Sequence, residues 1–110
     1  MRKQSLLLAI FALLMSAPAY AQRTTATVRG TVRDSTQAVL PGATVTVTNT
    51  DTGLTRATVT NSVGAYVVPE LPVGRYKITA ELQGFKTASR TDVSLRVADD
   101  LGLDFELAAG

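Results

Sequence analysis

Polar and apolar residues alternate with a period of two along most of this sequence, and no other feature limits the possible folds as strongly. The segments ATVTVT (residues 43–48) and RYKITAEL (75–82) are the clearest examples. Successive side chains of a β-strand point to opposite faces, so each such segment predicts a strand with one apolar and one polar face. We therefore expect an all-β protein in which Val45 and Val47 face a core, while Thr44, Thr46 and Thr48 face solvent.

Five further segments alternate in the same way and bring the expected number of strands to about seven. In the least regular of them we place Ala57, Val59 and Val97 on the apolar face. No helical pattern of useful length follows residue 22. Short strands at this spacing predict a single antiparallel β-sandwich. The further segments are 26–33, 57–59, 66–68, 93–97 and 101–107.

Residues that favour turns separate the alternating segments. Pro41-Gly42 predicts a tight turn, and the segments 50–53 and 61–64 predict hairpin loops that end in glycine. Pro69 and Pro72 have no N–H to donate to a ladder, so we expect residues 69–74 to be a connection rather than part of a strand.

The first 21 residues have the pattern of a secretory signal peptide. A basic start (MRKQ) is followed by the apolar run SLLLAIFALLM and by SAPAYA, which ends in small residues. The prediction is a helical leader over residues 1–21, cleaved between Ala21 and Gln22, and one exported domain over 22–110. A membrane anchor is the alternative, but the apolar run is shorter than the roughly 20 residues that span a bilayer. No later segment is long and apolar enough to cross a membrane.

Removing the leader changes the charge of the chain. The sequence has 11 Lys and Arg, of which Arg2 and Lys3 belong to the leader, so nine remain against nine Asp and Glu. The mature net charge is therefore zero, and no basic cluster suggests a nucleic-acid partner. The chain has no cysteine, so disulfides do not stabilise it.

The residue types that most often carry catalysis are missing. Without histidine or cysteine, the usual zinc ligand sets and the Ser-His and Cys-His pairs are excluded. We expect no enzyme, no cofactor, and no catalytic, cofactor-binding or metal-binding residues, and we assign no ligand-binding residue. Asp99, Asp100 and Asp104 form the densest carboxylate cluster. Weak calcium binding there is one interpretation, and a solvated turn is the favoured one.

The aromatic residues after the leader give little support to a carbohydrate platform. Tyr66, Tyr76 and Phe105 fall on the apolar side of their strands, and Phe85 follows a glycine where it is expected to cap the core. Rings that stack on a ligand need an exposed flat face. This weakens the hypothesis of carbohydrate binding without excluding it.

Three segments resemble a known family, the carboxypeptidase regulatory-like domain, a transthyretin-like (prealbumin-like) β-sandwich. They are GTVRDSTQAVLPGATVTVTNTDTG, TNSVGAYVVPELPVGRYKITAELQGF and VSLRVADDLGLDFEL, and the resemblance spans residues 26–107. Its most specific marks are Gly30 with Val32 and Asp34, the turn 40–43, Gly64-x-Tyr66, the stretch 71–76 and Gly84-Phe85. Asp99-Asp100 stands where the family more often has a turn that contains glycine.

The resemblance implies a non-catalytic accessory module. A leader followed directly by this domain is typical of the N-terminus of TonB-dependent outer-membrane receptors, where the domain lies on the periplasmic side. The chain stops at LAAG, where such a receptor would continue, so we expect a fragment or truncated frame rather than a free-standing exported domain. Attached receptor domains or a protein partner are expected, with contact by backbone pairing at an exposed sheet edge. The alternatives are a carbohydrate-binding module of a secreted protein, located outside the cell, and a structural spacer.

Overall fold

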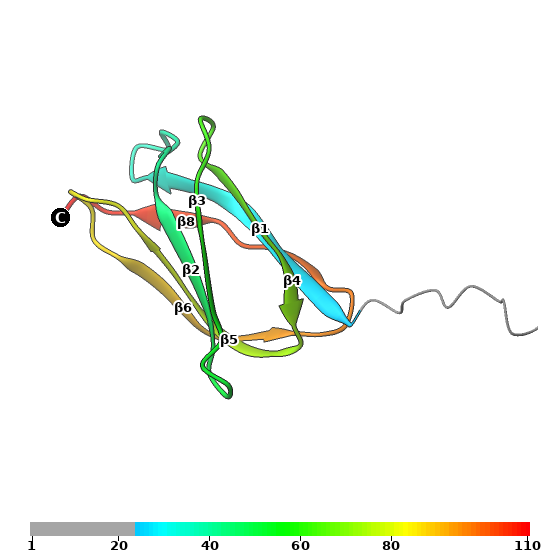
Figure 1. The fold of residues 1–110 in the computed structure, drawn as a ribbon. Coiled ribbons are helices and arrows are strands. Elements are labelled where there is room, and N and C mark those ends of the chain that lie inside the picture. Colours follow the sequence, from blue (N-terminus) through cyan, green and yellow to red (C-terminus); the bar gives the residue numbers. More distant parts are fainter. Residues whose placement is uncertain (1–23) are drawn as a thin grey trace, which may run out of the picture.

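The structure, a computed structural model, describes residues 24–110, which form a two-sheet β-sandwich (Figure 1). The predicted leader, residues 1–21, and its cleavage site lie outside the described residues. The first strand starts at one end of the sandwich, and the C-terminus lies at the other end. The eight strands of the described residues are β1 (Thr25–Asp34), β2 (Thr44–Asn49), β3 (Thr55–Val59), β4 (Ala65–Pro72), β5 (Gly74–Glu81), β6 (Ala88–Leu95), β7 (Asp100–Gly102) and β8 (Phe105–Leu107).

The strands form two sheets, and the predicted all-β sandwich is confirmed. One sheet has the order β4-β1-β7, with β8 also paired to β1, and the other has the order β3-β2-β5-β6. Most pairs are antiparallel, as expected, but β7 and β8 both run parallel to β1. Parallel neighbours need a long connection, and here the whole second sheet lies between β1 and β7 in the sequence.

The core lies between the sheets and follows the predicted alternation. Val45, Val47 and Ile78 are fully buried, whereas Thr44 and Thr46 are partly exposed on the outer face of their sheet. Burial of a side chain of this size contributes about 2 kcal/mol each. The core is made of Ala26, Val28, Val32, Leu40, Ala43, Val45, Val47, Tyr66, Val68, Leu71, Tyr76, Ile78, Ala80, Leu95, Phe105 and Leu107.

The prediction for Ala57, Val59 and Val97 is wrong, because all three are exposed. In β3, Ala57 pairs with Thr46 and Val59 pairs with Thr44, and residues that pair directly share a face. The outer threonine face of β2 therefore fixes Ala57 and Val59 outward. Val97 lies beyond the end of β6, where the alternation no longer applies.

The prediction of a connection over residues 69–74 is wrong, because residues 69–72 belong to β4 and Gly74 begins β5, so that only Val73 connects the two strands. β4 is an edge strand, and a proline is tolerated where its missing N–H would point away from the neighbouring strand. The register against β1 shifts between Ala26 and Val28, so Pro69 and Glu70 together oppose Thr27 in a β-bulge. The positive φ of Glu70, 57°, belongs to this bulge.

The predicted last strand, residues 101–107, divides into β7 and β8 where the chain passes Gly30 of β1. A Cβ atom on Gly30 would lie 1.8 Å from the carbonyl oxygen of Leu103. At the same point, the Oδ1 of Asp104 accepts a hydrogen bond of 2.8 Å from the N–H of Thr31. A side chain thus replaces a backbone acceptor, and the register is the same on both sides of the break. Only a glycine permits this close approach.

The predicted hairpin loop at 50–53 is confirmed, because it joins the paired strands β2 and β3. The prediction of a hairpin at 61–64 is wrong, because this turn joins β3 to β4 of the other sheet. Asparagine side chains stabilise both turns. The Oδ1 of Asn49 accepts hydrogen bonds from the N–H groups of Asp51 and Thr52, at 2.9 and 3.0 Å. The Oδ1 of Asn61 accepts from the N–H groups of Val63 and Ala65, both at 3.0 Å. Such contacts satisfy turn N–H groups that no ladder reaches.

Candidate functional site

The described residues offer two kinds of candidate site, which are the unpaired edges of the sheets and shallow surface pockets. A sheet edge presents free N–H and C=O groups that can pair with another strand. In this sandwich the edges are β4 and the β7–β8 side of one sheet, and β3 and β6 of the other. These edges differ in how open they are to pairing with another strand.

The β4 edge is blocked by its own sequence and by an arginine from the other sheet. Pro69 has no N–H, and the bulge at Glu70 interrupts the strand. The Nη1 of Arg56, on β3, donates hydrogen bonds to the carbonyl oxygens of Pro69 and Glu70 at 3.2 and 2.6 Å. These contacts also join the two sheets along this margin.

Two further edges are irregular or short. β6 contains a bulge, because Tyr76 pairs with Val93 but Ile78 pairs with Arg90. Asp92, within this bulge, has a positive φ of 56°. β7 and β8 have three residues each. Bulges and short strands are the ways in which natural sheets discourage pairing at their edges.

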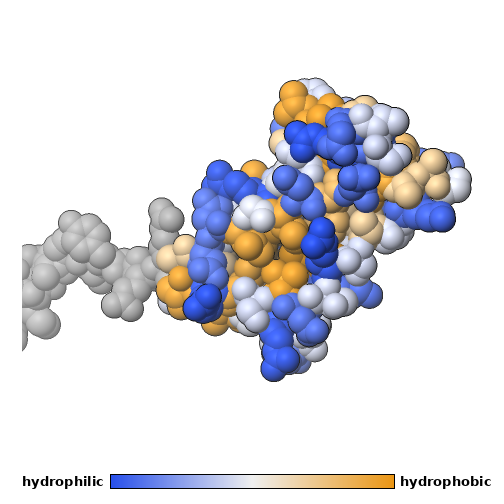
Figure 2. Space-filling view, turned by 180° about the vertical axis from the view of Figure 1, so that it is seen from behind, coloured by the Kyte–Doolittle hydropathy of each residue, from blue (hydrophilic) through white to orange (hydrophobic). Residues whose placement is uncertain are grey.

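The margin between β6 and the β7–β8 segment is closed mainly at the C-terminal end of the sandwich. There the N–H of Lys86 donates to the carbonyl of Ala108 at 2.7 Å, and Phe85 forms a bridge with Ala109. Seen from behind, hydrophobic residues gather in the middle of the molecule, with hydrophilic residues around them (Figure 2). Several apolar side chains are only partly buried against the core, namely Leu82, Phe85, Ala88, Val93, Leu101 and Leu103.

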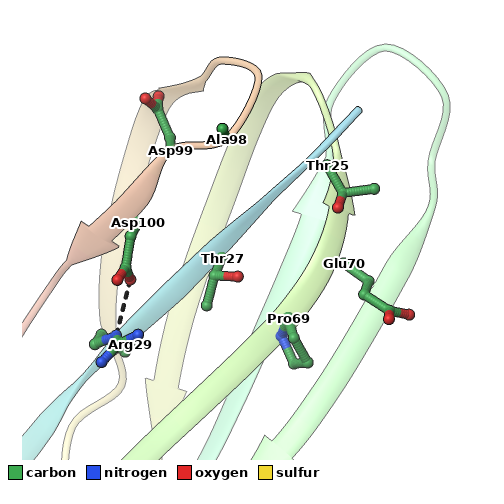
Figure 3. Close-up of a pocket in the computed structure, with 8 residues that line it drawn as sticks. All are labelled: Thr25, Thr27, Arg29, Pro69, Glu70, Ala98, Asp99 and Asp100. Carbon is green, nitrogen blue, oxygen red and sulfur yellow. Dashed lines mark hydrogen bonds and ion pairs between the residues drawn. The ribbon is translucent and has the colours of Figure 1, made fainter. Parts of the chain in front are cut away.

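One of several shallow surface pockets lies beside the start of β1 and has a volume of about 340 Å³ (Figure 3). The Nε of Arg29 and the Oδ1 of Asp100 form an ion pair of 2.8 Å, and both side chains are more than half exposed. An ion pair so exposed contributes about 0–1 kcal/mol. Asp99 and Glu70 lie on opposite sides of the pocket, so their carboxylates do not converge on a common point.

The three aspartates of the candidate calcium cluster each have a separate partner. Asp100 pairs with Arg29, and Asp104 accepts from Thr31. The Oδ2 of Asp99 accepts a hydrogen bond of 2.8 Å from the N–H of Arg96 and so stabilises the turn before β7. Within residues 24–110, no group of three potential metal-ligating side chains is found. The arrangement favours the interpretation as a solvated turn.

The same turn forms without the glycine that the family more often has at Asp99-Asp100. Ala98 adopts a positive φ of 62°, a conformation that glycine reaches at lower cost. The N–H of Asp99 donates to the carbonyl of Arg96 at 3.1 Å. The side chain and backbone of Asp99 together hold the turn in this conformation.

The aromatic side chains lie where the sequence places them. Tyr66, Tyr76 and Phe105 are buried, and Phe85 packs half-buried against the core. The hydroxyl of Tyr76 donates to the carbonyl of Pro72 at 2.5 Å, and that of Tyr66 donates to the carbonyl of Leu103. Burial, followed by the charge of Asp104, raises the pKa of Tyr66 far above its usual value, so this hydroxyl stays neutral. Among the described residues, no fully exposed aromatic ring is left to stack on a sugar.

In the described part of the chain, no helix has the length and apolar character needed to cross a membrane.

Comparison with known proteins agrees with this architecture. The sequence model of the carboxypeptidase regulatory-like domain matches residues 27–108. The chain belongs to this family. It is also 36% identical over 97 residues to the TonB-dependent transporter Oar of Myxococcus xanthus, covering 86% of this chain. The chain spans 9% of the length of that transporter.

Solved structures show how widely the fold is used. The TIE protein of Bacillus anthracis superposes with a TM-score of 0.65 at 16% identity, over 78% of this chain and 17% of that one. A protein from Bacteroides uniformis whose name proposes carbohydrate binding gives 0.61 at 18% identity, over 76% and 41%. Catechol 1,2-dioxygenase from Acinetobacter radioresistens gives 0.64 at 12% identity, over 86% and 55%. At these identities the likeness concerns the fold alone.

Sequence reasoning predicted contact at a sheet edge without saying which edge. The edges that are blocked, and the role of Arg56 in blocking one, depend on the order of strands in the sheets. Residues 54–60 contain no proline or glycine, but neither does the bulged strand β6, so the sequence carries no signal that distinguishes the two edges.

Proposed function

We propose that this chain is a non-catalytic exported accessory module, the N-terminal periplasmic domain of a TonB-dependent outer-membrane receptor. The observation that carries the proposal is the 36% identity to the transporter Oar over 86% of this chain. The match of the family to residues 27–108 supports the accessory role, because that match covers the sandwich except for the first two residues of β1. Its contacts with partner domains are made by backbone pairing at a sheet edge.

The chemistry of the surface agrees with a role in binding rather than in catalysis. Asp99, Asp100 and Asp104 are engaged in separate contacts, and the tyrosine hydroxyls are bonded to carbonyls inside the sandwich. The likeness to dioxygenases at 12% identity carries no activity over to this chain.

The proposed export is tested with the full chain carrying a C-terminal tag in a Gram-negative host. We expect the tag in the periplasmic fraction and an N-terminus at Gln22, as the leader predicts. A tagged chain that stays in the cytoplasm with residues 1–21 attached would contradict the proposal.

The receptor context is tested at the gene. We expect the reading frame to continue from Gly110 into a plug and barrel, and an in-frame deletion of residues 24–108 to reduce assembly or uptake by that receptor. A frame without these domains would favour the structural spacer, which the placement of the start of β1 and the C-terminus at opposite ends of the sandwich also suits.

Carbohydrate binding is tested by affinity gel electrophoresis of residues 22–110, which contain every residue of the core, against a panel of polysaccharides. We expect no retardation, because the buried rings offer no stacking surface. Retardation by one polysaccharide would replace the accessory-domain proposal with the carbohydrate-binding alternative.

A further inference from the structure

Strand β3 is the most regular open edge formed by the described residues. It has five residues and pairs with β2 from Thr44 to Thr48 without a register shift. The other edges carry a proline and bulge, a bulge, or strands of three residues. A regular, uninterrupted edge is the one most suited to accept another strand.

The hydrogen bonds that flank β3 show which backbone groups point outward. The N–H of Asn49 donates to the carbonyl of Leu54, and the N–H of Thr60 donates to the carbonyl of Ala43. In an antiparallel pair such hydrogen-bonded positions alternate, so Leu54, Arg56, Thr58 and Thr60 bond to β2. The residues whose N–H and C=O groups face the open side are Thr55, Ala57 and Val59.

We propose that β3 pairs antiparallel with β3 of a second copy of this chain, about a two-fold axis at Ala57. Ala57 then pairs with Ala57 of the other copy, and Thr55 pairs with Val59. The outward groups of both strands form about six backbone hydrogen bonds. The two four-stranded sheets that contain β3 become one continuous sheet.

The sequence of β3 is complementary to itself in this register. On the outer face, β-branched Thr55 lies opposite Val59, and two small alanines meet at the axis. On the inner face, Arg56 lies directly opposite Thr58. The two Arg56 side chains are diagonal neighbours rather than a directly opposed pair, and each donates to carbonyls of β4 in its own copy. Pairs of β-branched residues stabilise antiparallel strands, whereas opposed like charges destabilise them.

The charge of the chain favours a second copy over a charged peptide as the occupant. Residues 22–110 carry nine Lys and Arg and nine Asp and Glu, so two copies approach without net repulsion. Val59 is 58% exposed at the end of the strand, and the pairing covers part of its apolar surface. The contact is smaller than a standard interface, so the dimer is weak and depends on concentration.

The test compares variants of residues 22–110 by sedimentation equilibrium over a range up to about millimolar concentration. Ala57→Pro removes an outward N–H without removing a bond to β2, and each dimer loses two hydrogen bonds. We expect the dimer dissociation constant to rise about ten-fold or more. Ala57→Thr keeps the N–H and is expected to stay within about three-fold of the original chain.

Val67→Pro provides a matched proline control on the blocked β4 edge. The N–H of Val32 donates to the carbonyl of Gly64, so by the same alternation the N–H of Val67 points outward. We expect this variant to dimerise like the original chain. Thermal melts of all variants show whether each one is folded before the constants are compared.

Amide exchange locates the contact independently of the variants. Raising the concentration should slow exchange at Thr55, Ala57 and Val59 and leave the amides of β6 unchanged. A chain that stays monomeric at millimolar concentration overturns the proposal. Equal weakening by Ala57→Pro and Val67→Pro, or new protection on β6 instead of β3, overturns it as well. The outcome does not depend on the proposed receptor.

Discussion

The place where the β7–β8 segment passes Gly30 of β1, here called the Gly30 contact, is packed much more closely than the outer threonine face of β2. At the Gly30 contact, the carbonyl of Leu103 occupies the position that a side chain on Gly30 would need, and the hydroxyl of Tyr66 donates to the same carbonyl. On the outer face, Thr44 and Thr46 are partly exposed to solvent. Both regions follow the same period-two pattern, so the difference arises from what lies against each face.

Alternation therefore predicts the direction of a side chain but not how much room it has. Gly30 and Val28 both fall on the inward face of β1, and a larger residue is accepted at only one of these positions. Packing in protein interiors leaves few voids, so the room at a buried site depends on its neighbours in space.

The largest loss of stability is expected from a substitution on the inner face of the same sheet, opposite its outer threonine face. Ile78→Asp buries an unpaired carboxylate in the core, which costs about 4 kcal/mol or more, a large part of the stability of a domain of this size. We expect the variant to be unfolded at 25 °C by circular dichroism. A cooperative melt close to that of the original chain would show that the inner face is misassigned.

A smaller but still large loss of stability is expected from a substitution at the Gly30 contact. Gly30→Ala places a methyl group against the Leu103 carbonyl and should cost about 3 kcal/mol, measured by denaturant unfolding. Gly102→Ala is the matched control, because nothing lies within 4 Å of its added Cβ, and it should stay within about 1 kcal/mol. Equal losses of stability for the two alanine variants would mean that the Gly30 contact is not tightly packed.

The hydroxyl of Tyr66 donates to the same Leu103 carbonyl and therefore provides a second probe of the Gly30 contact. Tyr66→Phe leaves the Leu103 carbonyl without this donor and should cost about 1–2 kcal/mol at neutral pH. Because burial raises the pKa of Tyr66 in the folded state, the unfolded state loses its proton first, and stability should fall as pH rises above about 10. Unfolding free energies from pH 8 to 11 should show this fall in the original chain and a weaker one in the variant. Identical slopes would indicate that Tyr66 is not buried as described.

The smallest effect is expected on the outer face. Thr46→Asp changes a partly exposed side chain that borders solvent and should cost less than about 1 kcal/mol. Its melting temperature, measured beside that of Ile78→Asp, compares two faces of adjacent paired strands. A loss as large as that of the core variant would show that another surface covers the threonines.

Much of the fold could be predicted from sequence because the pattern is local. The burial of Tyr66, Tyr76 and Phe105 follows from their places in alternating segments. Ala57 and Val59 were mispredicted, because β3 contains polar residues on both sides of its alternation and only its pairing with β2 decides which side faces inward. The preferred edge for pairing could not be predicted either, since it depends on which strands end up at the margins.

The sequence alone determined the strand character, the inward and outward faces of β2 and β5, and the positions of the turns, because backbone geometry and solvent exposure act on neighbouring residues. The tertiary structure decided the parallel pairing of β7 and β8 with β1, the need for glycine at position 30, and the blocking of the β4 edge by Arg56. These features join residues distant in the chain, and their energies depend on distances that exist only after the two sheets have packed.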